Sequence, residues 1–314
     1  MFINSTGFYI PAGRVDNDYF FNVNGLTSDW ILKRTGIQTR SKAAENEGHN
    51  SMGLAAIEDA IKTLHYNIKD VDLIVSASYS PYDTVATLAH ITQQKYNISN
   101  VKAVYASSAC SSFVNGLEIV EGYFAMGKAS KALLVCSEHN TYYSNEEDSK
   151  CGHLWGDGAV AFFLSAERLN DTDPEIRQIY TRGLGNVGKG PEGVRLRPKE
   201  GGIAMPDGKD VFIHACKYMI QALDGVTLPE NINKSDLDYI ICHQANKRIV
   251  ANVANQLGLS DDRFINNIEQ FGNTGSASAA IVFAQNRNKF KQGNLVGLTV
   301  FGGGYSCGAF LIKI

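Results

Sequence analysis

Three residues combine a reactive side chain with a place where an apolar segment is expected to end. Cys110 lies in SSACSSF between an expected strand and an expected helix, His243 lies in CHQAN after an aliphatic run, and Asn273 lies in FGNTGSASAA. A thiol at the start of a helix is close to the positive end of the helix dipole, which lowers the thiol pKa and raises the thiolate fraction. Cys110 is therefore predicted to be a nucleophile.

The other two side chains offer hydrogen-bond donors for such a nucleophile. The imidazole of His243 can donate or accept a proton near neutral pH, and the amide of Asn273 donates without titrating. The glycine-rich segment FGGGYSCG, residues 301–308, can bring a backbone N–H close because glycine has no side chain in the way. Together these groups predict a nucleophile whose reaction passes through a stabilised oxyanion.

Each of these residues also has a purely structural explanation. A free cysteine among small residues is often part of the core. His243 can be a hydrogen-bonded core histidine, or a metal ligand beside Cys242, although no further ligands follow at metal-binding spacing. Asn273 stands in a turn-forming context. The stretch GLGNVG, residues 183–188, matches GxGxxG but does not open a helix after a strand, so no dinucleotide site is predicted there.

Composition excludes several classes of protein. The chain has 314 residues, of which 44% are hydrophobic and 19% charged, and its net charge of −3 is not that of a nucleic-acid binder. No run of 18 apolar residues occurs and no basic segment leads into an apolar one at the start, so we expect a cytoplasmic protein that does not enter a membrane. The six cysteines lack CxxC spacing, which indicates free thiols and no zinc cluster.

The elements that must position these residues occur twice. An amphipathic helix expected at 52–66 leads into a strand expected at 70–78, and a helix expected at 212–223 leads into a strand expected at 236–244. This repetition predicts two α/β halves packed as one compact unit. Residues 1–172 form the half with Cys110, and residues 173–314 form the half with the histidine and the asparagine. Back-to-back packing would bring the equivalent strand-to-helix junctions close together.

Four motifs in this order and spacing resemble the β-ketoacyl-acyl-carrier-protein synthase III family, condensing enzymes of the thiolase superfamily. They are ACSSF, HQANKRI, GNTGSAS and FGGGYSCG. In addition, WILKRTGIQTR (30–40) is similar to the family's coenzyme A motif, and WGDGAVA (155–161) is similar to its Gly-Asp-Gly turn. The resemblance implies an α/β thiolase fold with duplicated halves in a five-layered αβαβα arrangement, and a homodimer.

The resemblance also implies an activity, decarboxylative Claisen condensation. Cys110 would take an acyl group from acyl-CoA, with the backbone N–H groups of Cys110 and Gly303 as the oxyanion hole. His243 and Asn273 would hold the carbonyl of a malonyl thioester carried by acyl carrier protein while carbon dioxide leaves. The product would be a β-ketoacyl thioester of a fatty-acid, specialised lipid or polyketide pathway, formed without a metal or other cofactor.

Further site residues follow from the same motifs. Trp30, Arg34 and Thr35 are expected to contact coenzyme A, and Lys247 and Arg248 to contact the acidic carrier protein.

Thr84 stands where acetyl-preferring members place a bulky aromatic residue of the partner subunit across the acyl pocket. We therefore expect acyl chains longer than acetyl to be preferred, unless Val85, Leu88 or a neighbouring loop refills the space. Two other functions stay open, a ketosynthase-like acyltransferase that forms an ester or amide, and a non-catalytic thiolase-fold subunit.

Overall fold

The computed structural model describes all 314 residues and contains one mixed sheet of nine strands in the order β11-β12-β13-β8-β1-β7-β6-β4-β5. Neighbours pair in parallel within β5-β4-β6 and β11-β12, and antiparallel elsewhere. The strands are β1 (Phe2–Tyr9), β4 (Leu73–Ala77), β5 (Lys102–Ala106), β6 (Lys131–Glu138), β7 (Gly158–Ser165), β8 (Glu175–Gly183), β11 (Tyr239–Cys242), β12 (Leu295–Gly302) and β13 (Ser306–Lys313).

The two halves of the sheet meet only where β1 lies beside β8. β1 and β8 share a single residue pair, Phe2 with Glu175, so the strands on either side form two separate surfaces. The predicted boundary between residues 172 and 173 lies in the loop that joins β7 to β8. Strands before this loop lie on one side of the junction, and strands after it lie on the other.

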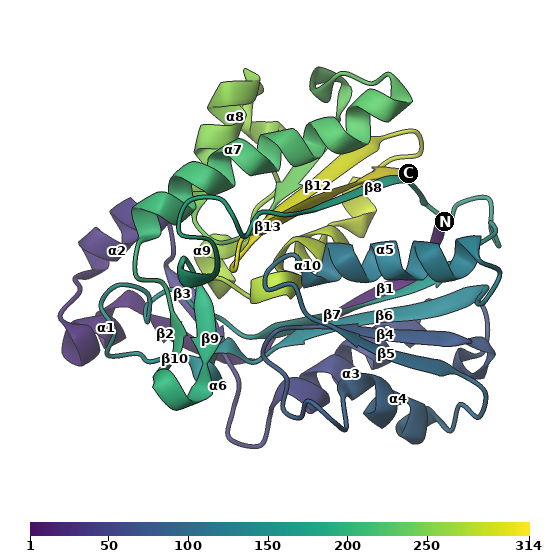
Figure 1. Cartoon of the computed structure of the whole chain (residues 1–314), viewed down its shortest axis with the longest axis horizontal. Helices are drawn as coiled ribbons and strands as arrows, with labels where there is room; N and C mark the ends of the chain where they lie inside the picture. The colour runs from purple at the N-terminus through teal and green to yellow at the C-terminus, as the bar shows by residue number, and fades with distance from the viewer.

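Helices cover both surfaces and fill the space between them, as Figure 1 shows. The outer helices are α3 (His49–Ile61) and α4 (Leu88–Tyr96) on one side, and α7 (Gly208–Thr227) and α8 (Lys247–Leu257) on the other. Between the two surfaces lie α5 (Ser112–Ala125) and α10 (Ser278–Gln285), which contact strands of both. The predicted five-layered αβαβα arrangement is confirmed.

The central layer explains why the sequence is so apolar around it. Phe113 of α5 packs against Phe162 of β7 and Phe310 of β13, with ring centroids 5.0 and 6.1 Å apart. All eight residues of β7 (GAVAFFLS) are buried because α3 covers one face and α10 the other. A strand covered on both faces needs a continuous apolar run.

The helices and strands predicted in the two repeats are present, with different ends. The predicted strands at 70–78 and 236–244 are the shorter strands β4 and β11, because the polar residues that flank them form turns. The predicted helix at 52–66 is α3, which begins three residues earlier and ends at Ile61. The predicted helix at 212–223 is α7, which is longer at both ends.

Smaller elements gather at the end of the sheets where β4, β5 and β11 finish, on the left in Figure 1. They are β2 (Gly13–Asp16), α1 (Asn17–Asn24), α2 (Ser28–Thr35), β3 (Thr39–Lys42), α6 (Asn140–Tyr143), β9 (Arg195–Arg197), β10 (Gly202–Ala204) and α9 (Ile268–Phe271), joined in places by short 3-10 helices. No helix of the chain has the length and apolar character needed to cross a lipid bilayer.

Candidate active site

Cys110 lies in a tight bend between β5 and α5. The preceding residue, Ala109, has φ +50°, a left-handed conformation that residues other than glycine rarely adopt. The bend is held by Ser112, whose hydroxyl accepts the N–H of Ser108 (2.8 Å) and donates to the carbonyl of Ala109 (2.6 Å). This geometry turns the Cys110 side chain, 7% exposed, away from the core of α5 and into a cavity.

The turn between β12 and β13 meets this bend from the other half of the chain. A Cβ atom on Gly302 would lie 3.0 Å from the backbone nitrogen of Cys110, so a larger residue would push the two segments apart. Burial raises the pKa of the thiol, and backbone hydrogen bonds from Gly303 and from Cys110 itself act in the opposite direction. The two groups predicted to form an oxyanion hole therefore lie at the same sulfur atom.

His243 directly follows β11 and is 3% exposed. Its Nδ1 atom lies 2.7 Å from the hydroxyl of Ser278, the first residue of α10, and that hydroxyl also accepts the N–H of Gln244 (3.2 Å). Burial lowers the pKa of His243 to about 4, because the buried site gives the charged ring none of the hydration that it would have in water. The imidazole is therefore neutral at pH 7, with Nε2 left for the cavity.

Asn273 is held by the Gly-Asp-Gly turn of the first half. Its N–H donates to the carbonyl of Leu154 (2.8 Å), and its carbonyl accepts the N–H of Gly156 (3.0 Å). Its side-chain Oδ1 accepts the N–H of Gly275 (3.0 Å), which fixes the orientation of the amide. The Nδ2 donors are then directed away from this turn.

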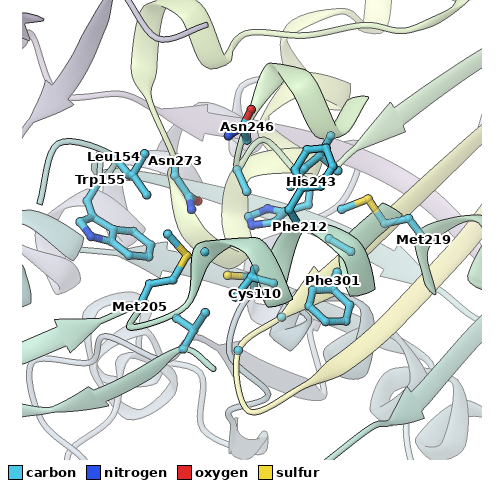
Figure 2. Close-up of a pocket in the computed structure, with 18 residues that line it drawn as sticks. Cys110, Leu154, Trp155, Met205, Phe212, Met219, His243, Asn246, Asn273 and Phe301 are labelled. Carbon is cyan, nitrogen blue, oxygen red and sulfur yellow. The ribbon is translucent and has the colours of Figure 1, made fainter. Parts of the chain in front are cut away.

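One cavity of about 670 Å³ brings these side chains together. Figure 2 shows Cys110, His243 and Asn273 facing the same space from three different segments of the chain. Most of the other lining residues are apolar, including Trp155, Met205, Leu154, Phe212, Met219 and Phe301. Polar groups in such water-poor surroundings interact more strongly than they would in water.

The predicted lowering of the Cys110 pKa is wrong. Burial and, after it, the carboxylate of Glu138 raise the pKa of Cys110 to about 12. Hydrogen bonds from Gly303, from Tyr79 and from the backbone of Cys110 act in the opposite direction but do not offset the loss of water. At pH 7 Cys110 is therefore a thiol.

Two of these neighbours were missed in the sequence. Glu138 ends the aliphatic strand KALLVCSE and is buried, which raises its pKa to about 7. It accepts the N–H groups of Tyr79 (3.2 Å) and Ser80 (3.0 Å), and it also bonds the hydroxyls of Ser80 and Ser276. A carboxylate at the end of an aliphatic strand was the available signal, and Tyr79 likewise directly follows the short linker after β4.

The three predicted coenzyme A residues line an outer cavity of about 1430 Å³. The guanidinium of Arg34 lies 4.5 Å from the ring centroid of Trp30. Thr35 is buried, and its hydroxyl already donates to the carbonyl of Ile31 (2.8 Å) and accepts the N–H of Ile37 (3.0 Å). The Thr35 hydroxyl therefore stabilises the end of α2, which forms part of the wall of this cavity.

The outer cavity adjoins the cavity at Cys110. Both are lined by Leu154, Met205, Gly208, Phe212 and Asn246. Three cations besides Arg34 line the outer one: Lys150, Lys209 and Arg248. A basic entrance thus leads through an apolar passage to the thiol.

The two predicted carrier-protein contacts differ in their surroundings. Arg248 lines the outer cavity with its guanidinium 5.7 Å from the ring centroid of Phe212. Lys247 does not line it, because its ammonium group pairs with Glu269 and its side chain packs on Gly36.

Thr84 lies in the exposed loop between β4 and α4 and lines neither cavity that reaches Cys110. The role expected for Thr84 concerns the pocket of a partner subunit, and it stays a prediction. The second cavity at Cys110, of about 900 Å³, extends under β9 and β10. It shares Trp155, Val194 and Gly303 with the first, so Cys110 stands where the two meet.

Comparisons with known proteins agree with one another. Residues 106–182 match the model of the family described as 3-oxoacyl-[acyl-carrier-protein (ACP)] synthase III, and residues 229–314 match the model of its C-terminal part. The β-ketoacyl-[acyl-carrier-protein] synthase III of Neisseria gonorrhoeae is 33% identical over 99% of this chain and 98% of its own length. The protein of the same name from Bartonella bacilliformis is 31% identical over 98% of this chain and 97% of its own.

A solved structure matches over the same extent. The 3-oxoacyl-[acyl-carrier-protein] synthase III of Aquifex aeolicus superposes with a TM-score of 0.92 at 28% identity, and the match covers 100% of this chain and 99% of that one.

Proposed function

The chain belongs to the 3-oxoacyl-[acyl-carrier-protein] synthase III family, and we propose that it joins an acyl group from acyl-CoA to a malonyl thioester by decarboxylative Claisen condensation. It is a condensing enzyme of the acyltransferase class, suited to priming a fatty-acid or polyketide chain. The observation that carries this proposal is the cavity in which Cys110, His243 and Asn273 meet.

In the first half-reaction the sulfur of Cys110 attacks the thioester carbonyl of acyl-CoA. We assign the tetrahedral oxyanion to the backbone N–H groups of Cys110 and Gly303, because both residues line the cavity around the reacting sulfur. Coenzyme A leaves as a thiolate and takes up the proton that the thiol loses. An acyl group remains on Cys110 as a thioester.

In the second half-reaction a malonyl thioester replaces coenzyme A. We infer that the Ser278 hydroxyl donates a hydrogen bond to Nδ1 of His243. The neutral ring then carries its own proton on Nε2, which faces the cavity. Nε2 and the free Nδ2 donors of Asn273 then bond the thioester carbonyl while carbon dioxide leaves. The enolate carbon attacks the acyl group on Cys110, and the thiol regains a proton as the β-ketoacyl thioester departs.

The donor on Asn273 favours condensation over the two other functions. Ester or amide formation from an acyl-enzyme involves no malonyl enolate and has no use for an amide donor fixed by Gly275. A non-catalytic subunit would not need a strained bend at Ala109 to present a thiol to a cavity.

Partners follow from the surroundings of the site. The cations of the outer cavity, with Trp30 beside them, fit the phosphates and adenine of coenzyme A, and Arg248 at its mouth fits an acidic carrier protein that delivers the malonyl group. β5 is the outermost strand of its surface, and we propose that it pairs with a second copy in a homodimer. We propose a cytoplasmic location, where acyl-CoA and carrier-protein thioesters would be available to the enzyme.

Intact-protein mass spectrometry tests the proposal. The protein is incubated with a panel of acyl-CoAs, and then with malonyl-CoA or with malonyl-acyl carrier protein. We expect a retained acyl mass that Cys110→Ser abolishes, followed by its loss as a β-ketoacyl thioester forms. A chain that takes no acyl group at Cys110, or that releases the group only as a carboxylic acid, ester or amide, is not this condensing enzyme.

A further inference from the structure

Tyr79 stands beside the nucleophile without a role in the reaction described so far. It lies just after β4 and lines the second cavity at Cys110. Its ring occupies the space over Gly275, where a Cβ atom would come within 2.6 Å of the tyrosine oxygen. Gly275 has φ +62°, so glycine is favoured there both by its backbone conformation and by the tyrosine. The phenol is therefore held between the turn that carries Asn273 and the thiol.

The direction of the tyrosine hydroxyl follows from its neighbour Asn140. The Nδ2 group of Asn140 donates to the carbonyls of Gly156 (2.8 Å) and Asn273 (3.1 Å), which identifies its other side-chain atom as the oxygen. That Oδ1 accepts the hydroxyl of Tyr79 at 2.7 Å. The hydroxyl has one proton, so it can donate one hydrogen bond. While Cys110 is a thiol, that hydrogen bond is donated to Asn140.

Tyr79 and Cys110 line the same cavity. Burial and Glu138 raise the pKa of the thiol, and a side-chain hydrogen bond from Tyr79 acts in the opposite direction. The pKa of Tyr79 is itself raised well above its ordinary value, first by burial and then by Cys110. The phenol consequently keeps its proton at every pH at which the enzyme can work. It can donate, but it cannot act as a base.

We propose that Tyr79 is a further catalytic residue, whose hydroxyl proton turns from Asn140 to the Cys110 sulfur when the thiol ionises and returns when the sulfur is acylated. The reason is the difference between the two acceptors. A hydrogen bond to a charged sulfur is about twice as strong as one to a neutral amide oxygen. Once acylated, the sulfur is a neutral thioester and accepts hydrogen bonds poorly. The tyrosine hydroxyl therefore donates to the Asn140 oxygen again. No bond to the proton breaks in this turn, so Tyr79 stays a phenol throughout.

This arrangement links the two half-reactions. The carbonyl of Asn273 accepts a hydrogen bond from the same amide group that receives the tyrosine proton. Tyr79 is thus linked through Asn140 to the turn of Asn273 while the sulfur is a thiol or a thioester, and it bonds the sulfur while the thiolate exists. The inference rests on the proposed role of Cys110 as nucleophile.

Other titratable groups also surround the thiol and the phenol. Glu138 and Cys136 approach from β6, Asp157 from the turn before β7, and His243 from the end of β11. Glu138 raises the pKa of Cys110, in opposition to the tyrosine. Replacing Tyr79 by Phe leaves all of these groups in place, so a change in thiol ionisation in that variant reports the hydroxyl alone.

The test is the rate at which iodoacetamide alkylates Cys110 between pH 7 and pH 9, with the site identified by peptide mass. Only the thiolate reacts, so below the pKa the rate follows the thiolate fraction. Losing one hydrogen bond to a charged group corresponds to a fall of about tenfold or more. We expect Tyr79→Phe to be alkylated at least about tenfold more slowly than the parent protein across this range, on a parallel pH profile.

The matched control is Tyr105→Phe. The Tyr105 hydroxyl donates to the carbonyl of Ser78 at 2.7 Å. Tyr105 lines neither of the two cavities that reach Cys110. This variant also loses one tyrosine hydrogen bond near the site, and it should react at the parental rate. Equal rates for Tyr79→Phe and the parent, or an equal fall in both variants, would overturn the proposal.

If Tyr79→Phe does not fold, Tyr79→Met fills the position without a donor and should show the same slowing. Alkylation needs neither acyl-CoA nor a malonyl thioester, so it separates this proposal from the proposed function. A protein that fails to condense but shows slower alkylation in Tyr79→Phe would refute condensation and retain Tyr79. A protein that condenses but shows unchanged alkylation would do the reverse.

Discussion

Removing the amide donor of Asn273 should separate the two half-reactions. In Asn273→Ala the cavity loses the Nδ2 donors, whereas Cys110 and the backbone N–H of Gly303 stay in place. We expect acyl loading of Cys110 within a few-fold of the parent. Decarboxylation of the malonyl thioester should fall by about 100- to 1000-fold, because one such donor contributes about 2.7 to 4 kcal/mol to a transition state that develops negative charge.

The geometry of the turn requires a second variant. Alanine also removes Oδ1, which accepts the N–H of Gly275, and this loss can displace the turn. Asn273→Asp keeps that acceptor but replaces the donor by a carboxylate beside the developing enolate. Its decarboxylation should be at least as slow as that of the alanine variant, since like charges repel.

The assay reads each half-reaction separately. Intact mass follows acyl loading, and release of labelled carbon dioxide from malonyl thioester follows decarboxylation. Thr274→Val is the control, because it changes the neighbouring residue and removes a buried hydroxyl that has no hydrogen-bond partner. Decarboxylation at the parental rate in both Asn273 variants would refute the enolate role, and equal losses in loading and decarboxylation would show a collapsed site.

Three further predictions concern the entrance, the acyl pocket and the thiol. Arg34→Ala should raise the KM for acyl-CoA in the loading step by roughly tenfold to a hundredfold, as expected for one lost charged hydrogen bond. The control Lys33→Ala removes an exposed cation paired with Asp29 and should leave this KM unchanged. Thr84→Phe should shift loading toward short chains in a competition of acetyl-CoA with octanoyl-CoA, because each buried methylene contributes about 0.8 kcal/mol; dominant acetylation of the parent would contradict an open pocket. Glu138→Gln should speed alkylation of Cys110 at pH 8 and have less effect at pH 6, since the carboxylate whose pKa lies at about 7 raises the thiol pKa only when it is charged; an unchanged rate at pH 8 would rule out this influence.

Much of the site could be predicted because its signals are local. Cys110 and His243 follow strands, Asn273 stands in the turn after α9, and all three line one cavity. The repeated helix and strand patterns were also readable, because amphipathic and aliphatic periodicity reflects which residues must be buried. The glycines of FGGGYSCG indicated a close backbone approach, and Gly302 is where a Cβ atom would press on Cys110.

Other properties of the same residues depend on what lies around them in space. The position of Cys110 before a helix predicted a lowered pKa, yet burial and a carboxylate 28 residues further along the chain raise it. Thr35 stands in a coenzyme A motif, but its hydroxyl is used inside its own helix, and Lys247 is paired with Glu269. Sequence spacing carries no record of such contacts.

Tyr79 shows the limit most clearly. The residue types and spacing around Cys110, His243 and Asn273 determined the kind of chemistry, because a nucleophile and its donors must have reactive groups. The tertiary structure alone decided how those groups ionise. It placed Tyr79 beside them from the end of β4, and Glu138 and Asn140 from the end of β6. The reason is physical: loss of water and contact with charge or hydrogen-bond donors set a pKa, and both arise only when distant segments pack together.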